Sequence, residues 1–276
     1  MKILIAPNAF KNSLDAVAAA VAICSGLQKS RLDCECLQQP IADGGDGMLT
    51  VMLSQEGGER HKAKVDGPLG QPVEAEYGLL NQGKTAVIEM AEASGIRLLS
   101  RDELNPMKTS TFGTGQLISA ALNAGAEEVV IGIGGSATVD LGLGMAQALG
   151  VQLLDKNGKH ISRGGDGISQ LHKIGMGGMD KRINNTRIVI TCDVNNTLLE
   201  APSVFGPQKG ADEAMVNHLE KEFERVGRLV EETLGKEIIS IRHGGAAGGL
   251  GAGLFAFLNA ELVEGTDYLL SRTGFH

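Results

Sequence analysis

The stretch Glu127–Gly150, EEVVIGIGGSATVDLGLGMAQALG, decides the fold class of this chain. It begins with β-branched residues that run up to Ile133, and such a run predicts a buried strand. The glycine-rich turn Gly134–Thr138 follows, and apolar residues then recur at helical spacing from Leu141 to Leu149. A strand, a tight turn and a helix in this order predict an α/β fold.

The same turn has the features of an anion-binding loop. Backbone N–H groups converge at a helix N-terminus, the helix dipole favours negative charge, and Gly134 and Gly135 let a phosphate approach the backbone. Ser136 and Thr138 carry hydroxyl groups that can cap the helix or bind phosphate. The alternative is an ordinary capped turn between a strand and a helix.

Composition excludes several classes of protein. The chain has 276 residues, of which 42% are hydrophobic, so it is long enough for two domains with a substantial core. Its net charge of −8 and its 3% of aromatic residues argue against nucleic acid and anionic membranes as partners. With no signal peptide, no apolar run of membrane-spanning length and four cysteines without metal-ligand spacing, we expect a cytoplasmic protein. The expected partner is a small molecule, with a homodimer as a further possibility.

Carboxylates follow two of the predicted strands. Asp43 and Asp46 flank a Gly-Gly pair before a predicted helix, where two like charges suggest a bound cation. Asp193 and Asn195 follow the buried strand Arg187–Thr191, and this position suits a metal ligand or a general base. Turn and cap chemistry is the alternative at both places.

Two lysines lie in tight loops. Lys11 follows the N-terminal strand Lys2–Ala6, at the carboxyl end where open α/β sheets bind ligands. Lys209 lies in Phe205–Ala211, FGPQKGA. Both are candidate contacts for a phosphate or a carboxylate, and a solvated surface position is the alternative for Lys11.

Two segments match nucleotide-binding motifs: one lies in the wrong structural context, and the other is a weak match. Gly78–Thr85, GLLNQGKT, satisfies the Walker A pattern, but strand-like residues continue on both sides, so we reject it as a nucleotide loop. Gly132, Gly134 and Ala137 fit the dinucleotide pattern G-x-G-x-x-[GA], with Asp155 at the distance of a ribose contact. A dinucleotide-dependent oxidoreductase is therefore an alternative function.

Taken together, the chain resembles the glycerate kinase family of bacterial glycerate and glucarate catabolism. The matching segments cover nearly the whole chain in the family's order: IAPNAFKNSL, PIADGGDGM, TAVIEMAEASGIRLL, NPMKTSTFGTGQLI, GIGGSATVDLGLGMAQALG, TCDVNNTLL, VFGPQKGA and GGAAGGLGAGL.

The resemblance implies ATP-dependent phosphorylation of D-glycerate with Mg²⁺, in a cleft between two α/β domains. One is a discontinuous Rossmann-like domain, here residues 1–64 plus 242–276, and the other is a mixed α/β domain inserted at 65–241. Phosphoryl transfer needs positioning, a cation and a base near the acceptor hydroxyl. The residues that the resemblance and the loops assign are Asp193, Asp43 and Lys11 as catalytic, Asp193, Asp43 and Asp46 as metal-linked, and Gly134, Gly135, Ser136, Thr138, Asn195 and Lys209 as binding substrate or phosphate.

The chain also departs from the family. It has Val139 where the family usually has an asparagine, and Leu141–Leu143 where the family has Gly-Ala. It ends at His276, before a further acidic glycine-rich motif and more strands of the first domain. We therefore expect an incomplete Rossmann-like domain with exposed sheet edges. A truncated relative that binds ligand without catalysis is the alternative function that follows from this.

Overall fold

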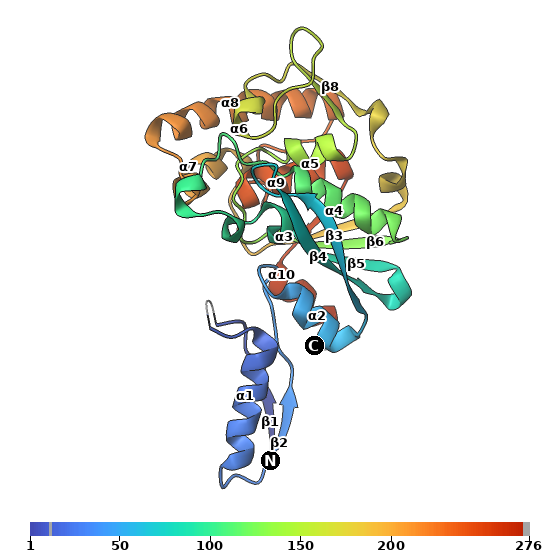
Figure 1. Ribbon diagram of the computed structural model, residues 1–276, viewed down its shortest axis with the longest axis vertical. Coiled ribbons are helices and arrows are strands. Elements are labelled where there is room, and N and C mark those ends of the chain that lie inside the picture. The colour runs from blue at the N-terminus through green and yellow to red at the C-terminus, as the bar shows by residue number, and fades with distance from the viewer. Residues whose placement is uncertain (11–12, 273–276) are drawn as a thin grey trace.

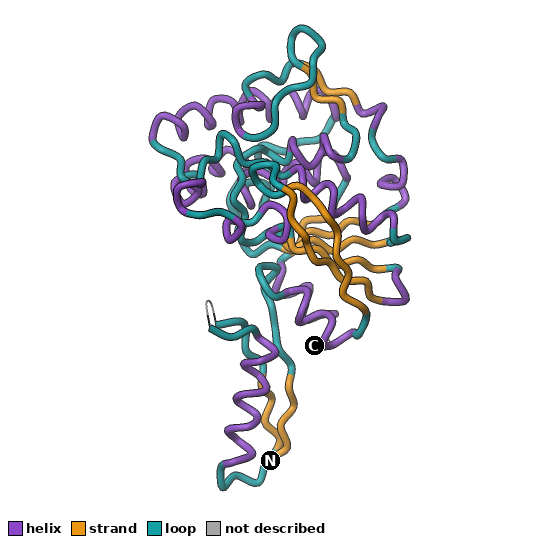
Figure 2. Tube along the Cα trace, viewed as in Figure 1, coloured by secondary structure: helices purple, strands orange, loops and turns teal. Residues whose placement is uncertain are grey.

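The computed structural model describes residues 1–10 and 13–272, and it confirms an α/β fold built on a mixed six-stranded sheet (Figures 1 and 2). The strand order is β10-β9-β6-β5-β4-β3, and two further pairs, β1-β2 and β7-β8, form small separate sheets. The strands are β1 Lys2–Ile5, β2 Glu35–Gln38, β3 Glu59–Asp66, β4 Pro72–Leu80, β5 Thr85–Glu89, β6 Glu128–Gly132, β7 Gln152–Leu154, β8 Lys173–Gly175, β9 Arg187–Thr191 and β10 Glu261–Val263.

Helices cover both faces of the large sheet (Figure 1). They are α1 Ala16–Lys29, α2 Met48–Glu56, α3 Ala91–Ser94, α4 Phe112–Asn123, α5 Leu143–Ala148, α6 Gly165–Ile168, α7 Ala201–Phe205, α8 Glu213–Leu234, α9 Ala246–Leu258 and α10 Gly265–Arg272. Among the helices in the described part of the chain, none is both long enough and apolar enough for a membrane span.

The two faces follow from the alternation of side chains along the strands. In β6, Val129 and Ile131 belong to the main core under α4, α8 and α9, whereas Val130 packs on the opposite face with α2 and α10. Strands β5, β6, β9 and β10 run parallel, and parallel strands are typically covered on both faces, which explains the continuous β-branched runs in the sequence.

The Walker-like segment Gly78–Thr85 lies in an antiparallel hairpin. Strand β4 ends at Leu80, residues Asn81–Gly83 form a short 3₁₀ turn, and β5 begins at Thr85. Because no helix follows the lysine, the backbone amides are not gathered around an anion. The rejection of this motif is confirmed.

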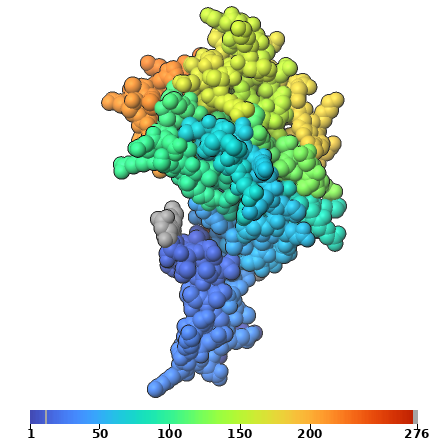
Figure 3. Space-filling model, viewed as in Figure 1, coloured from blue at the N-terminus to red at the C-terminus, as the bar shows by residue number. Residues whose placement is uncertain are grey.

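The N-terminal segment forms a small unit of β1, α1 and β2 that projects from the main body (Figures 1 and 3). The two strands pair in parallel, with Ile3 opposite Cys36 and Leu4 opposite Leu37. Leu4 and Leu37 are 53% and 44% exposed, so this sheet has one uncovered face within the described residues. The expected strands at both places are confirmed.

The segment after residue 241, which we expected to pack with residues 1–64, packs on the main body instead. Strand β10 adds to β9 in the large sheet, and the apolar side chains of α9 are buried in the main core. Residues 59–64, expected in the first domain, are part of β3 in the same sheet. The expected boundaries at 64/65 and 241/242 therefore do not follow the sheet, because an apolar helix and a free strand edge bury most surface against the larger core.

Candidate functional site

A cavity of about 920 Å³ lies where the N-terminal unit meets the main body. Its walls are the loops that follow β1, β2, β6 and β9, together with residues around α7 and the start of α9. Figure 3 shows the N-terminal unit standing below the main body, with a notch between the two. Loops at the carboxyl ends of parallel strands are the usual ligand-binding edge of an α/β sheet.

Glycines let these loops approach each other backbone to backbone. A Cβ on Gly44, whose φ is +88°, would lie 2.7 Å from the carbonyl oxygen of Thr191, and one on Gly134 would lie 2.7 Å from the Cα of Gly45. The loops after β2, β6 and β9 thus meet at one place. Close packing between loops accounts for these glycines even before a ligand is considered.

The loop after β6 does not lead directly into a helix. Helix α5 begins at Leu143 with Gly142 as its N-cap, so the predicted capping by Ser136 or Thr138 is wrong. The buried carboxylate of Asp140 instead accepts hydrogen bonds from Gly142 N at 3.1 Å and from Thr111 N at 2.8 Å. For the same reason the dinucleotide pattern at Gly132–Ala137 lacks the helix that it requires.

Lys209 is buried beside this loop, with 1% of its surface exposed. Its Nζ donates to Ser136 Oγ and to the carbonyl oxygen of Thr138, both at 2.7 Å. No carboxylate of the described residues forms an ion pair with it at 4.0 Å or less. Burial lowers the pKa of Lys209 from 10.5 to about 7, although the more distant charge of Asp140 acts in the opposite direction.

A buried ammonium group without a carboxylate partner is unfavourable, and an anion in the cavity would compensate for it. Lys209 and Ser136 both line the cavity, as do Gly134 and Gly135. Thr138 is fully buried and does not line the cavity, and its Oγ1 has no hydrogen-bond partner among the described residues.

Besides Asp15, the N-cap of α1, three carboxylates line the cavity, each already held by protein groups. Asp43 Oδ1 accepts from Gly45 N at 3.0 Å, and its Oδ2 accepts from Asn8 Nδ2 at 3.4 Å. Asp46 pairs with Arg97 at 3.0 Å. In the described residues, the three do not form a ready cluster of metal ligands.

Asp193 is held by the first turn of α10. Its Oδ1 accepts from Gly265 N at 2.8 Å, and its Oδ2 accepts from the hydroxyl of Thr266 at 2.8 Å. Asn195, two residues further on, accepts from Arg242 Nε at 2.7 Å and does not line the cavity. The structure therefore separates Asp193 from Asn195, which the sequence had placed in one site.

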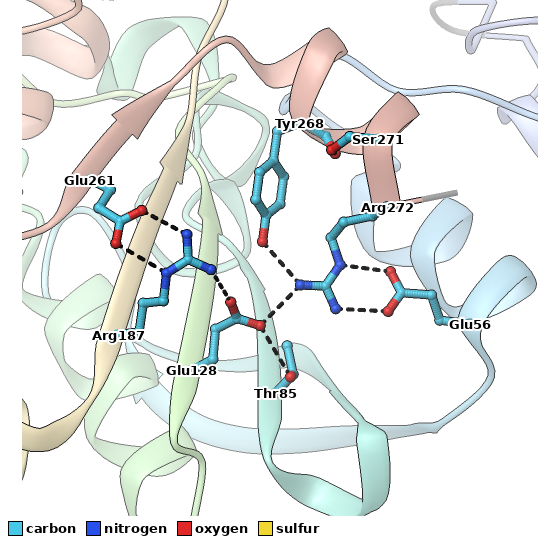
Figure 4. A network of polar contacts seen from close by, with 8 residues as sticks. All are labelled: Glu56, Thr85, Glu128, Arg187, Glu261, Tyr268, Ser271 and Arg272. Carbon is cyan, nitrogen blue, oxygen red and sulfur yellow. Dashed lines mark hydrogen bonds and ion pairs between the residues drawn. The ribbon is translucent and has the colours of Figure 1, made fainter. Parts of the chain in front are cut away.

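Helix α10 is anchored at its other end by a charge network (Figure 4). Arg272 makes a bidentate pair with Glu56 of α2 and contacts Glu128 of β6 at 2.9 Å. Glu128 is also bound by Arg187, which pairs with Glu261 of β10. The helix that holds Asp193 is thus tied to three strands and to α2, and this fixes the carboxylate relative to the sheet.

The model of the family described as "Glycerate kinase family" matches residues 3–276. The chain belongs to the glycerate kinase family. A glycerate kinase of Halalkalibacterium halodurans is 48% identical over 99% of this chain and 73% of its own length. A glycerate 2-kinase of Escherichia coli K12 is 44% identical, over 97% of this chain and 71% of its own length.

A solved structure shows the same fold within the family. The crystal structure of a protein from Salmonella typhimurium LT2, named as a glycerate kinase 2, matches with a TM-score of 0.91 and 42% identity. It covers 99% of this chain, and this chain covers 74% of that one. About a quarter of each of these glycerate kinase relatives thus has no counterpart among the 276 residues.

Sequence reasoning missed some of the residues around the site. Glu89, at the end of β5, accepts from Gly47 N at 3.1 Å and Leu49 N at 2.9 Å, and so fixes the start of α2. Burial raises the pKa of this carboxyl group. An acidic residue that ends the buried run TAVIE was the available signal. Lys11, the remaining predicted residue, lies outside the described residues.

Proposed function

We propose that this chain phosphorylates D-glycerate with ATP and Mg²⁺, and that the reaction takes place in the cavity between the N-terminal unit and the main body. The observation that carries the proposal is Lys209, a buried lysine without a carboxylate partner that lines the cavity beside the Gly134–Ser136 loop and whose charged form an anion would stabilise. An anionic ligand would compensate for the buried ammonium group. The relatives named glycerate kinase indicate that this ligand takes part in the phosphorylation of glycerate.

In this proposal the phosphates bind to the Gly134–Ser136 loop and Lys209. Mg²⁺ usually keeps several waters and binds proteins through one or two carboxylates together with substrate phosphates, so a dedicated cluster of ligands is not required. Asp43 and Asp193 suit that role because they line the cavity. Asp46 is the weaker candidate, because it is already paired with Arg97. When bound, Mg²⁺ would neutralise charge on the transferring phosphate.

The acceptor oxygen of glycerate forms a bond to the γ-phosphorus of ATP, while the bond from that phosphorus to the β,γ-bridging oxygen breaks. The hydroxyl proton passes to a base, and we assign Asp193 to this step. The contacts that its two oxygens make with Gly265 and Thr266 hold the carboxylate in one orientation. Lys11, which follows β1 in the sequence, is proposed as a contact for the glycerate carboxylate.

A coupled assay that detects ADP tests the proposal on the full chain. Formation of ADP that depends on D-glycerate supports it. A folded chain that binds ATP or glycerate without forming ADP would favour the alternative, a non-catalytic ligand-binding relative. A folded chain that binds neither ligand would overturn both functions.

Lys236 offers a matched control for Lys209. It donates to the carbonyl oxygens of Phe255 and Ala256, and burial lowers its pKa too, but it lies away from the cavity. Lys209→Met should reduce kcat/KM by at least a hundredfold, the order expected when a group that stabilises transferring charge is removed. Lys236→Met should leave kcat/KM within about threefold of the unchanged chain.

A further inference from the structure

Three of the four cysteines of the chain gather in the small N-terminal unit. Cys24 lies on α1, Cys34 directly precedes β2, and Cys36 lies on β2. The fourth, Cys192, follows β9 in the main body. Cys24 and Cys36 therefore lie on two elements of this unit that pack against each other, and Cys34 lies next to one of them.

Side-chain alternation points Cys36 toward α1. In β1, Ile3 and Ile5 belong to the small apolar cluster of this unit, whereas Leu4 is exposed on the other face. Cys36 pairs with Ile3 across the parallel ladder and shares its face, so it packs against the same cluster. Cys24 belongs to that cluster from the α1 side, with 5% of its surface exposed.

The thiol groups are close enough to influence each other. Burial, together with the neighbouring thiols of Cys24 and Cys34, raises the pKa of Cys36 to about 11. The Cys36 thiol is therefore protonated at neutral pH, and its exchange with a disulfide becomes faster as pH rises.

Of the possible pairs, Cys24 with Cys36 is favoured because both side chains pack in the same apolar cluster. Cys34 and Cys36 are two residues apart in nearly extended chain, so their Cα atoms are about 6.6 Å apart at a strand's rise per residue, the upper limit for a disulfide. Cys34 is not part of the apolar cluster that holds Cys24. A link between α1 and β2 also joins elements that otherwise share only a small core.

We propose that Cys24 and Cys36 form a reversible disulfide that fastens α1 to β2. The oxidant is a low-molecular-weight disulfide such as oxidised glutathione. One protein thiolate attacks it and releases one glutathione thiolate, and the second protein thiolate then attacks the mixed disulfide and releases the other. Two protein thiols and one glutathione disulfide thus become one protein disulfide and two molecules of reduced glutathione.

The bond would act on the part of the unit that lines the cavity. Asn8, Ala9 and Phe10 lie between β1 and α1 and line it. Closing residues 24–36 into a loop restricts the unfolded unit and lowers the population of its open forms. The inference is independent of the proposed function, because it concerns only the chemistry of the thiols.

The test is disulfide mapping on the full chain at pH 8 in a glutathione buffer, with free thiols alkylated after an acid quench. Cleavage after Lys29 and after Glu35 places the three cysteines in separate peptides. We expect a linked peptide that contains Cys24 and Cys36, with Cys34 and Cys192 alkylated. A link that involves Cys34, or free Cys24 and Cys36 under excess oxidised glutathione, would overturn the proposal.

One further variant and a measurement on the unchanged chain test the Cys24–Cys36 disulfide without substituting either of its cysteines. Cys34→Ser should form the same linked peptide, because Cys34 is outside the pair. Amide hydrogen exchange in α1 should slow by about tenfold or more on oxidation of the unchanged chain. Equal exchange before and after oxidation would show that the bond does not fasten α1 to β2.

Discussion

Removal of the Lys209 ammonium group should change how the stability of the protein depends on pH. The pKa of Lys209 is about 7 in the folded chain, against 10.5 ordinarily. Between these values the unfolded chain holds a proton on Lys209 and the folded chain does not. The free energy of unfolding therefore rises with pH in this window, and the stabilisation is lost as pH falls toward 7.

The magnitude follows from the two pKa values. At pH 8 about nine in ten folded molecules lack the proton, so the slope from this group is about 1.2 kcal/mol per pH unit. Over the whole window the contribution is on the order of 5 kcal/mol, from 1.36 kcal/mol for each pKa unit. From pH 7.5 to 9.5 the difference between the unchanged chain and Lys209→Met should grow by about 2.5 kcal/mol.

Urea unfolding at pH 7.5, 8.5 and 9.5 measures this difference. All other titrating groups are common to both proteins, so they cancel in the comparison. A constant loss of packing or hydrogen bonds in Lys209→Met shifts its curve without changing the slope. Lys236→Met, the control, should keep the slope that is due to Lys209. Parallel pH profiles for the unchanged chain and Lys209→Met would refute the reasoning.

Three further predictions concern the groups that shape the site. Gly44→Ala should destabilise the chain by about 2 kcal/mol or more in urea unfolding, because the added Cβ meets Thr191 at a positive φ. The control Gly47→Ala has open space around its Cβ and should cost only the backbone strain of about 1 kcal/mol. Equal losses in the two variants would contradict the close approach of Gly44 to Thr191. Asp140→Asn should lower stability by about 3 kcal/mol, since an amide cannot accept from all the donors that surround this carboxylate; a thermal midpoint within 1 °C of the unchanged chain would speak against it. Arg272→Met should lower the free energy of unfolding by about 1–3 kcal/mol and make it less sensitive to salt, because the variant loses the ion pairs with Glu56 and Glu128. An unchanged salt dependence would exclude a contribution of these ion pairs to stability.

The large elements of the fold could be predicted from the sequence because their signals are local. The buried run before Gly134 and the strand Arg187–Thr191 are both present as predicted. The rejection of the Walker-like segment also rested on local evidence, since strand-like residues on both sides of a turn indicate a hairpin. The glycerate kinase resemblance came from the series of motifs rather than from any one of them.

The start of α5 could not be predicted in this way. Ser136 and Thr138 are good capping residues by type, but a tertiary contact with Lys209 uses the Ser136 hydroxyl and the Thr138 carbonyl oxygen. The carboxylate of Asp140 instead accepts from the amides of Gly142 and Gly144, and its partner Thr111 is 29 residues away. The path of the chain after residue 241 likewise depends on which sheet edge is free, and no local pattern reveals that.

The positions of some site residues could be predicted from the sequence, but the residues that contact them could not. The positions of Asp43 and Asp193 on one cavity follow from the rule that loops after parallel strands gather at one edge, whereas Lys209 lies in a 3₁₀ turn after α7, which that rule does not place. The groups that hold them come from elsewhere in the chain, as with Thr266 on Asp193 and Arg97 on Asp46. Spacing alone carries no information about such partners.

The central claim is that this chain transfers a phosphoryl group to glycerate. The most direct measurement is ³¹P NMR of the full chain with ATP, Mg²⁺ and D-glycerate, which observes the product itself. The account predicts a new phosphomonoester signal that grows together with ADP, requires D-glycerate, and grows at least about a hundredfold more slowly with Lys209→Met at low substrate concentration. ADP formation without a phosphomonoester, or no reaction from a folded chain, would contradict it.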